Sequence, residues 1–197
     1  MNNNNITKHA SHIDVKTRES RHKHRGCAIW ITGLSGSGKS TLAFAVEKEL
    51  FDRGYLSYVL DGDNLRSGLC SNLGFDPQSR SENIRRTAET AKLFKDAGLI
   101  TIVAVISPLE IDRENAKKII GQENFIEIFC NAPIEICEDR DIKGLYKKAR
   151  SGLLLNFTGI SSPYQAPKNP SLIIDSSKTN VKSSVEMVLN YLLKKIL

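Results

Sequence analysis

The chain has 197 residues, of which 40% are hydrophobic and 25% charged, as expected for one globular domain with a buried core. No apolar run approaches the roughly 18 to 20 residues that cross a bilayer, and the start, Met1 followed by an asparagine run at 2–5, lacks the apolar core of a secretory signal. We therefore expect a cytoplasmic protein that binds no membrane. The formal net charge of +6 fits either nucleic acid or a cleft for anionic substrates.

The cysteines indicate free, buried thiols. Cys27, Cys70, Cys130 and Cys137 share no C-x-x-C spacing, and they lie in or near predicted strands and helices, where a thiol behaves as a small apolar group. We expect neither disulfides nor a zinc site.

Residues 1 to about 25 are polar and basic, and we predict that they form a loosely ordered arm. His22 and His24 lie within this arm, where a solvated basic segment is favoured over a metal site.

The strongest motif in the chain predicts a phosphate-binding loop. An apolar, β-prone segment at 27–32 leads into a match to G-x-x-x-x-G-K-[ST], and residues 41–50 carry apolar side chains at helical spacing. A strand, a glycine turn and a helix in this order form a cradle for the phosphates of ATP. The residues assigned to ATP binding are Gly33, Leu34, Ser35, Gly36, Ser37, Gly38, Lys39, Ser40 and Thr41.

The residue types in this loop suit a polyphosphate. Glycines let several backbone N–H groups approach the phosphates, and the following helix directs its positive end at them. Lys39 adds a positive charge near the transferable phosphate, and the Ser40 hydroxyl can bind Mg²⁺.

A second predicted strand, residues 56–60, ends in Asp61-Gly62-Asp63. Carboxylates at the carboxyl end of a strand lie where ligands bind in an open α/β sheet, so Asp61 and Asp63 are candidates to hold Mg²⁺ with Ser40. Asp63 is also the candidate to orient an attacking hydroxyl or to accept its proton. Without the phosphate loop, a solvated turn would be the favoured interpretation. Arg66 offers a planar pair of donors to a substrate oxyanion.

Residues 71–78 are predicted to form a loop that exposes Phe75. A long helix is expected from Ser79 to about residue 97, starting with the capping box Ser79-x-x-Glu82. Arg80 and Asn83 lie in its first turns, where cations oppose the helix dipole. This placement indicates an anionic ligand, with solvated surface arginine as the alternative.

Residues 99–106 are a continuous β-branched run, which is typical of a strand buried on both faces at the centre of a parallel sheet. The run exits into Ser107-Pro108, again at a carboxyl end. A helix at 110–120, a strand at 125–130, a short helix from Pro133, a strand at 171–175 and a final helix continue the alternation. We therefore predict an α/β fold of the P-loop type, with about five parallel strands covered by helices on both faces.

Residues 139–166 form a basic insertion punctuated by glycines. Arg140 and Lys143 lie at its start and Phe157 near its end. Such a segment is typical of a lid that closes over phosphates, with a solvated helix face as the alternative. Phe75 and Phe157 could hold a planar base between them. Residues 26–197 are then expected to be a single domain that transfers a phosphoryl group to a small acceptor.

In its motifs the chain resembles the adenylylsulfate (APS) kinases of sulfate assimilation over about residues 26–197. The segments that carry the resemblance are WITGLSGSGKST at 30–41, LDGDNLR at 60–66, SENIRR at 81–86, ISP at 106–108, RDIKGLYKKAR at 140–150 and FTGI at 157–160. The first segment occurs in many kinases, whereas all of them in this order are specific to this family.

The resemblance implies that a homodimer transfers the γ-phosphate of ATP, with Mg²⁺, to the 3′-hydroxyl of APS, giving PAPS and ADP, and that it binds no nucleic acid. It implies catalytic roles for Lys39, Asp63 and Ser107. Ser107 matches a serine described as a phosphorylated intermediate in some members, although direct transfer needs no such relay, and we expect a substrate contact there.

The resemblance also implies the remaining ligand contacts. Phe75 and Phe157 would clamp the APS adenine, and Arg140 would lie near the ATP base or phosphates. The other residues carried over to the APS site are Asp63, Arg66, Arg80, Asn83, Ile106 and Lys143.

Three stretches depart from the family pattern: Ser67 replaces a frequent histidine, Leu153-Leu154-Leu155 replaces a stretch that usually includes glutamate and lysine, and residues 109–111 are less basic than usual. If the missing lysine helps to hold sulfate, Leu155 weakens APS binding. Two alternatives therefore stay open. One is a related kinase that acts on another nucleotide-linked acid. The other is a non-catalytic protein that binds nucleotides or nucleic acid, which the presence of both Lys39 and Asp63 disfavours.

Overall fold

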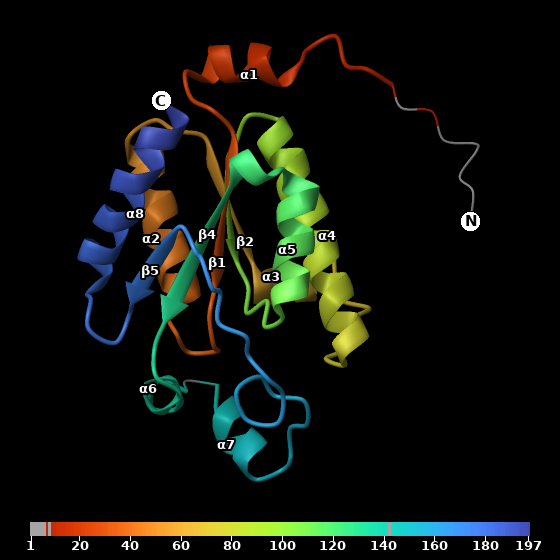
Figure 1. Ribbon diagram of the computed structural model, residues 1–197, viewed down its shortest axis with the longest axis vertical. Helices are drawn as coiled ribbons and strands as arrows, with labels where there is room; N and C mark the ends of the chain where they lie inside the picture. The colour runs from red at the N-terminus through yellow and green to blue at the C-terminus, as the bar shows by residue number, and fades with distance from the viewer. Residues whose placement is uncertain (1–6, 8, 142) are drawn as a thin grey trace.

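A five-stranded parallel sheet runs through the molecule between two layers of helices (Figure 1). The computed structural model describes residues 7, 9–141 and 143–197, so the asparagine run at 2–5 and Ile142 lie outside the described residues. The strands are β1 (Cys27–Thr32), β2 (Ser57–Asp61), β3 (Ile100–Ala104), β4 (Phe125–Asn131) and β5 (Leu172–Asp175), in the spatial order β2-β3-β1-β4-β5. The predicted α/β fold is confirmed.

The middle of the sheet differs from the expectation. We predicted residues 99–106 as the central strand, but β1 occupies the middle, with β3 and β4 beside it. Every residue of β1 and of β3 is buried. Two strands that are equally apolar cannot be ordered by composition alone, and strand order depends on the crossover connections.

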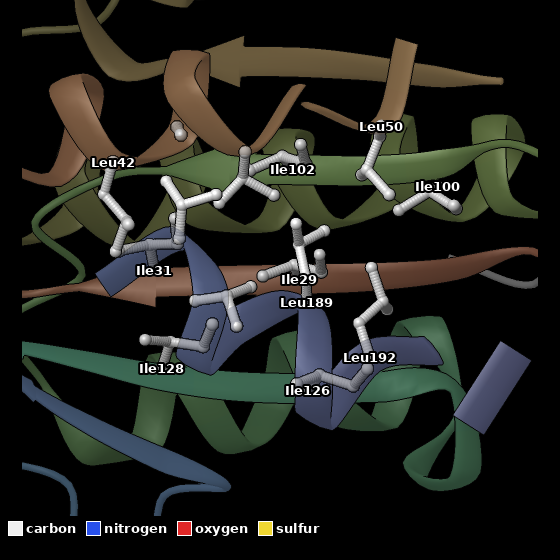
Figure 2. Packing of buried hydrophobic residues seen from close by; sticks show 14 of the residues in the cluster. Ile29, Ile31, Leu42, Leu50, Ile100, Ile102, Ile126, Ile128, Leu189 and Leu192 are labelled. Carbon is white, nitrogen blue, oxygen red and sulfur yellow. The ribbon is translucent and has the colours of Figure 1, made fainter. Parts of the chain in front are cut away.

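The two faces of the sheet are covered by different helices. α2 (Lys39–Asp52) and α8 (Val181–Ile196) pack on one face, and α4 (Pro77–Asp96) and α5 (Glu110–Ile120) pack on the other (Figure 1). Figure 2 shows the first layer, in which Leu42, Leu50, Leu189 and Leu192 of the helices meet Ile29, Ile31, Ile102, Ile126 and Ile128 of the strands. Because successive side chains of a strand alternate, Trp30 belongs to the opposite core.

The N-terminal segment is more ordered than we expected. Instead of a loosely ordered arm up to residue 25, Val15–His22 form α1, capped by Asp14. His22 Nδ1 lies 3.3 Å from the Gly98 carbonyl oxygen, and the Leu56 N–H donates to Nε2 of the buried His24 at 3.3 Å. These contacts join residues far apart in sequence, which is why a local pattern did not reveal them.

The start of α4 also differs from the prediction. Asp76, rather than Ser79, is the N-cap, and its side chain accepts a hydrogen bond of 2.9 Å from the Ser79 N–H. Pro77 occupies the first turn, where the missing N–H has no intrahelical partner to lose. Glu82 does not complete a capping box, because its carboxylate binds Arg85 and Arg86.

Short elements gather at the end of the sheet to which its strands point. They are α3 (Gly62–Ser67), α6 (Ile134–Asp139) and α7 (Leu145–Arg150). A separate short element, the 3₁₀ turn η1 (Gln122–Asn124), directly precedes β4. α6 and α7 lie at the opposite end of the molecule from α1 (Figure 1). We predicted no helix where α3 forms. Over the described ranges, no helix combines the length and the apolar character needed to cross a membrane.

Candidate active site

A cleft of about 740 Å³ opens at the carboxyl edge of the sheet, and it is lined by the phosphate loop, α3, the start of α4 and the 140–158 segment. Every residue predicted for the site lines this cleft except Gly33, Leu34 and Ser37, which belong to the loop itself. Segments more than a hundred residues apart therefore meet in one cavity.

The phosphate loop needs glycine for steric reasons. A Cβ on Gly36, which has a φ of +75°, would lie 2.7 Å from the Cys137 carbonyl oxygen. Within the loop, Lys39 Nζ donates to the Leu34 carbonyl oxygen at 2.7 Å. Burial lowers the pKa of Lys39 to about 8, because desolvation disfavours the ammonium form.

Ser40 and Asp61 join the loop to the end of β2. Ser40 Oγ donates to Asp61 Oδ2 at 2.7 Å, while Oδ1 accepts from the Asp63 N–H at 3.0 Å and caps α3. The described residues contain no group of three or more His, Cys, Asp or Glu side chains that could hold a metal. The two oxygens nevertheless suit Mg²⁺, which uses one or two protein oxygens together with substrate phosphates.

Asp63 and Lys143 meet across the cleft. Lys143 Nζ contacts Asp63 Oδ2, and both side chains are mostly exposed. An exposed ion pair contributes little to stability, so a substrate can replace the ammonium group at this carboxylate. The contact also links the 140–158 segment to the first turn of α3.

Arg66 and Arg80 make contacts within the protein as well as lining the cleft. Arg66 donates to the Gly74 carbonyl oxygen at 3.0 Å, and its guanidinium carbon lies 4.3 Å from the centre of the Phe75 ring. Arg80 donates to the Phe75 carbonyl oxygen at 2.8 Å and to Thr158 Oγ1 at 2.9 Å. A further Arg80 bond, to the Asn156 carbonyl oxygen, completes a link between α4 and the 140–158 segment.

The other predicted ligand residues occupy distinct environments. Phe75 is exposed, whereas Phe157 is buried and packs edge-to-face on Tyr146 with ring centres 4.9 Å apart. Asn83 is buried, and its Oδ1 has no hydrogen-bond partner among the described residues. An unpaired, buried amide oxygen in a cleft, such as that of Asn83, indicates a ligand that donates to it.

Arg140 donates to the Ser176 carbonyl oxygen at 2.7 Å.

Ser107 and Ile106 form the floor of the cleft after β3. Ser107 is buried and has a φ of +39°, and the Ile106 carbonyl oxygen accepts from Thr32 Oγ1 at 2.6 Å. A positive φ is uncommon for a serine, so the surrounding contacts hold it in place.

Sequence reasoning missed Ser176 and Thr158. Ser176 follows β5, and its hydroxyl donates to the Ser37 carbonyl oxygen of the phosphate loop at 2.7 Å. The position directly after a predicted strand, the same signal that selected Asp61 and Ser107, could have found it. Thr158 lay within the FTGI segment of the resemblance but does not follow a predicted strand, and the structure places it by its hydrogen bond to Arg80.

The cleft brings the phosphate loop together with a second group of basic and aromatic side chains, and the 140–158 segment contributes to its lining. That arrangement, on a parallel α/β sheet, defines a P-loop kinase whose acceptor is a small molecule.

Comparison with known proteins identifies the family. The family model of adenylylsulphate kinase matches residues 25–175. The chain is 53% identical over 189 residues to the adenylyl-sulfate kinase of Staphylococcus epidermidis, covering 96% of this chain and 95% of that protein. It is 52% identical over 192 residues to the one of Lactiplantibacillus plantarum, with coverages of 98% and 93%. The chain belongs to the adenylylsulphate kinase family.

A solved structure supports the same relationship. The structure of the Mycobacterium tuberculosis APS kinase CysC in complex with AMPPNP and APS superimposes with a TM-score of 0.83 at 47% sequence identity. The match covers 86% of this chain and 98% of that one. The similarity therefore extends over the fold that carries the cleft.

Proposed function

We propose that the protein transfers the γ-phosphoryl group of ATP to the 3′-hydroxyl of adenosine 5′-phosphosulfate, giving PAPS and ADP. The observation that carries this proposal is that the phosphate loop and the acceptor residues line one cleft. The similarity to a kinase whose structure holds both AMPPNP and APS supports the choice of substrates.

The donor side is formed by Lys39, Ser40 and Asp61. Lys39 neutralises charge on the transferred group, and Ser40 with Asp61 would hold Mg²⁺ beside the phosphates. When bound, Mg²⁺ supplies positive charge that offsets the charge developing on the phosphate oxygens. The loop glycines bring backbone N–H groups to the same oxygens.

Asp63 acts on the acceptor. Its carboxylate lies at the cleft in the first turn of α3 and forms an ion pair with Lys143. A carboxylate in this place orients the attacking hydroxyl and accepts its proton as the new P–O bond forms. The bridging oxygen of ATP then leaves on ADP with its electron pair.

The acceptor itself is held by aromatic and basic residues. Phe75 and Phe157 supply aromatic surface for a purine. Arg66, Arg80 and Lys143 supply positive charge for the phosphosulfate, and Asn83 Oδ1 is free to accept from a sugar or base N–H or O–H group. Arg140 lies on the ATP side, beside Ser176.

Leu155 makes the acceptor worth testing directly. It is 73% exposed and lines the cleft, so it adds apolar surface at a position where the family pattern usually has a charged residue. ADP release coupled to APS should show saturable turnover with ATP and magnesium. Turnover of other nucleotide-linked acids in preference to APS under the same conditions would instead establish the related kinase.

We also propose that the protein is a cytoplasmic homodimer. The four buried, free cysteines fit a reducing compartment. The homodimer is carried over from the resemblance of the sequence segments to the APS kinases. Light scattering on the purified protein measures the mass, and the mass of a single chain at micromolar concentration would overturn the dimer.

A further inference from the structure

Ser107 is held from behind by a tryptophan that does not reach the cleft. Trp30 Nε1 donates a hydrogen bond of 3.1 Å to Ser107 Oγ. The Trp30 side chain is fully buried in the core under α4 and α5, with its ring 5.7 Å from that of Phe125. Ser107, in contrast, lines the cleft. The contact therefore links the core to the floor of the active site.

The indole N–H of Trp30 determines how the Ser107 hydroxyl can take part in hydrogen bonds. An indole N–H can only donate, whereas a serine hydroxyl has one hydrogen and two acceptor lone pairs. The bond from Trp30 occupies a lone pair and leaves the hydroxyl hydrogen free. Within the described residues, no side-chain or backbone acceptor bonds that hydrogen. Because Ser107 lines the cleft, a ligand bound there can supply the acceptor.

The backbone of Ser107 is held by a second donor. Arg113 Nη1 donates to the Ser107 carbonyl oxygen at 2.8 Å, and Arg113 Nε pairs with Glu127 of β4 at 2.9 Å. The side chain of Arg113 is almost completely buried. These two donors, from β1 and α5, stabilise the left-handed conformation at Ser107.

We propose that Trp30 is a positioning residue that makes Ser107 a hydrogen-bond donor to the acceptor nucleotide. This inference rests on the proposed function. In the described part of the chain, the bond from Trp30 is the one hydrogen bond of Ser107 Oγ, so the hydroxyl is arranged to donate to a ligand and is not hydrogen-bonded to a base of the kind that activates a phosphoryl-accepting nucleophile. Ser107 binds the acceptor, and the phosphoryl group passes directly from ATP to it.

The chain offers a sharp test, because Trp30 is its one tryptophan. Biosynthetic replacement of tryptophan by benzothienylalanine, in which sulfur replaces Nε1–H, changes that position alone and preserves its shape. We expect the KM for APS to rise about two- to tenfold, the range for loss of one hydrogen bond, with the KM for ATP unchanged. Fluorotryptophan, which keeps the N–H, is the matched control and should leave both KM values unchanged.

Ser107→Ala separates positioning from packing. If Trp30 acts through the serine, benzothienylalanine should have no further effect on the KM for APS in the Ser107→Ala protein. An equal rise in both backgrounds, or none in the native background, would overturn the inference. Ser107→Ala should also keep measurable turnover, and complete loss of turnover in a folded protein would favour covalent relay instead.

A spectroscopic measurement checks the bond itself. Protein labelled with ¹⁵N-tryptophan gives one indole N–H signal, and it should shift in Ser107→Ala and on addition of APS. An unmoved signal in both cases would contradict the contact. Native turnover of APS tests the proposed function separately. If another nucleotide is the acceptor, its KM replaces that of APS in the same comparison.

Discussion

Ser40 of the phosphate loop and Asp61 at the end of β2 are joined by a hydrogen bond of 2.7 Å. The other oxygen of the same carboxylate caps α3 and thereby orients Asp63. One buried carboxylate thus connects the proposed magnesium site to the proposed acceptor carboxylate.

Asp61→Asn should separate these two roles. The amide oxygen still caps α3, but the negative charge beside Mg²⁺ is lost. We expect the magnesium concentration for half-maximal activity to rise by about tenfold or more, the effect of losing roughly 1.4 kcal/mol of charge interaction. Magnesium titration of the activity measures this, with the exposed Asp52→Asn as control. The same magnesium dependence in all three proteins would contradict the assignment.

The pKa of Lys39 gives a prediction about proton uptake. Burial lowers this pKa to about 8, and bound phosphates favour the charged form. Above about pH 8 the free lysine is increasingly neutral, so ATP binding must take up a proton and weaken as the pH rises. Calorimetry in two buffers of different ionisation enthalpy measures the uptake. Lys39→Arg stays charged and should show none; equal proton uptake by both proteins would refute the role of Lys39.

We expect Arg80 to hold residues 151–158 against α4. Arg80→Ala removes the bonds to Asn156 and Thr158, so the KM for APS should rise about tenfold or more, because hydrogen bonds of charged groups are each worth about 1.5 to 3 kcal/mol. Limited proteolysis near residues 151–158 should be faster. Arg85→Ala, which loses an exposed pair with Glu82, is the matched control. Identical cleavage rates in the two variants would contradict the link.

The buried His24 is expected to make the stability of the fold depend on pH. Burial lowers the pKa of His24, so the imidazole binds a proton less readily in the folded chain than in the unfolded chain, where it does so below about pH 6.5. Its contribution to stability is present above that pH and is lost as the pH falls towards the lowered pKa. The midpoint temperature of unfolding should therefore fall less between neutral and mildly acidic pH for His24→Gln than for the native protein. His9→Gln, at an exposed position, should behave as the native protein does.

Local signals predicted the parts of the site that local geometry determines. The glycine spacing fixed the phosphate loop, and the rule that ligands bind at the ends of parallel strands placed Asp61 and Ser107 in the cleft. The five-strand α/β fold followed from the alternation of strands and helices.

The remainder depends on contacts between distant segments. Trp30 and Ser107 are 77 positions apart, and Arg80 meets Thr158 across 78, so no window of sequence contains either pair. The same limit explains α1, which was expected to be an arm and is anchored through His22 and His24. At α4 the prediction rested on the capping box at Ser79 alone, whereas Asp76 caps the helix and Pro77 occupies its first turn.

The central claim is that Asp63 acts on the acceptor hydroxyl, and single-turnover transfer from ATP to APS tests it most directly. Asp63→Asn keeps the size of the side chain and removes the proton acceptor. We predict a rate lower by about a hundredfold or more, the usual contribution of a general base, with the dissociation constant for ATP unchanged. Transfer at the native rate by a folded Asp63→Asn protein would contradict the account.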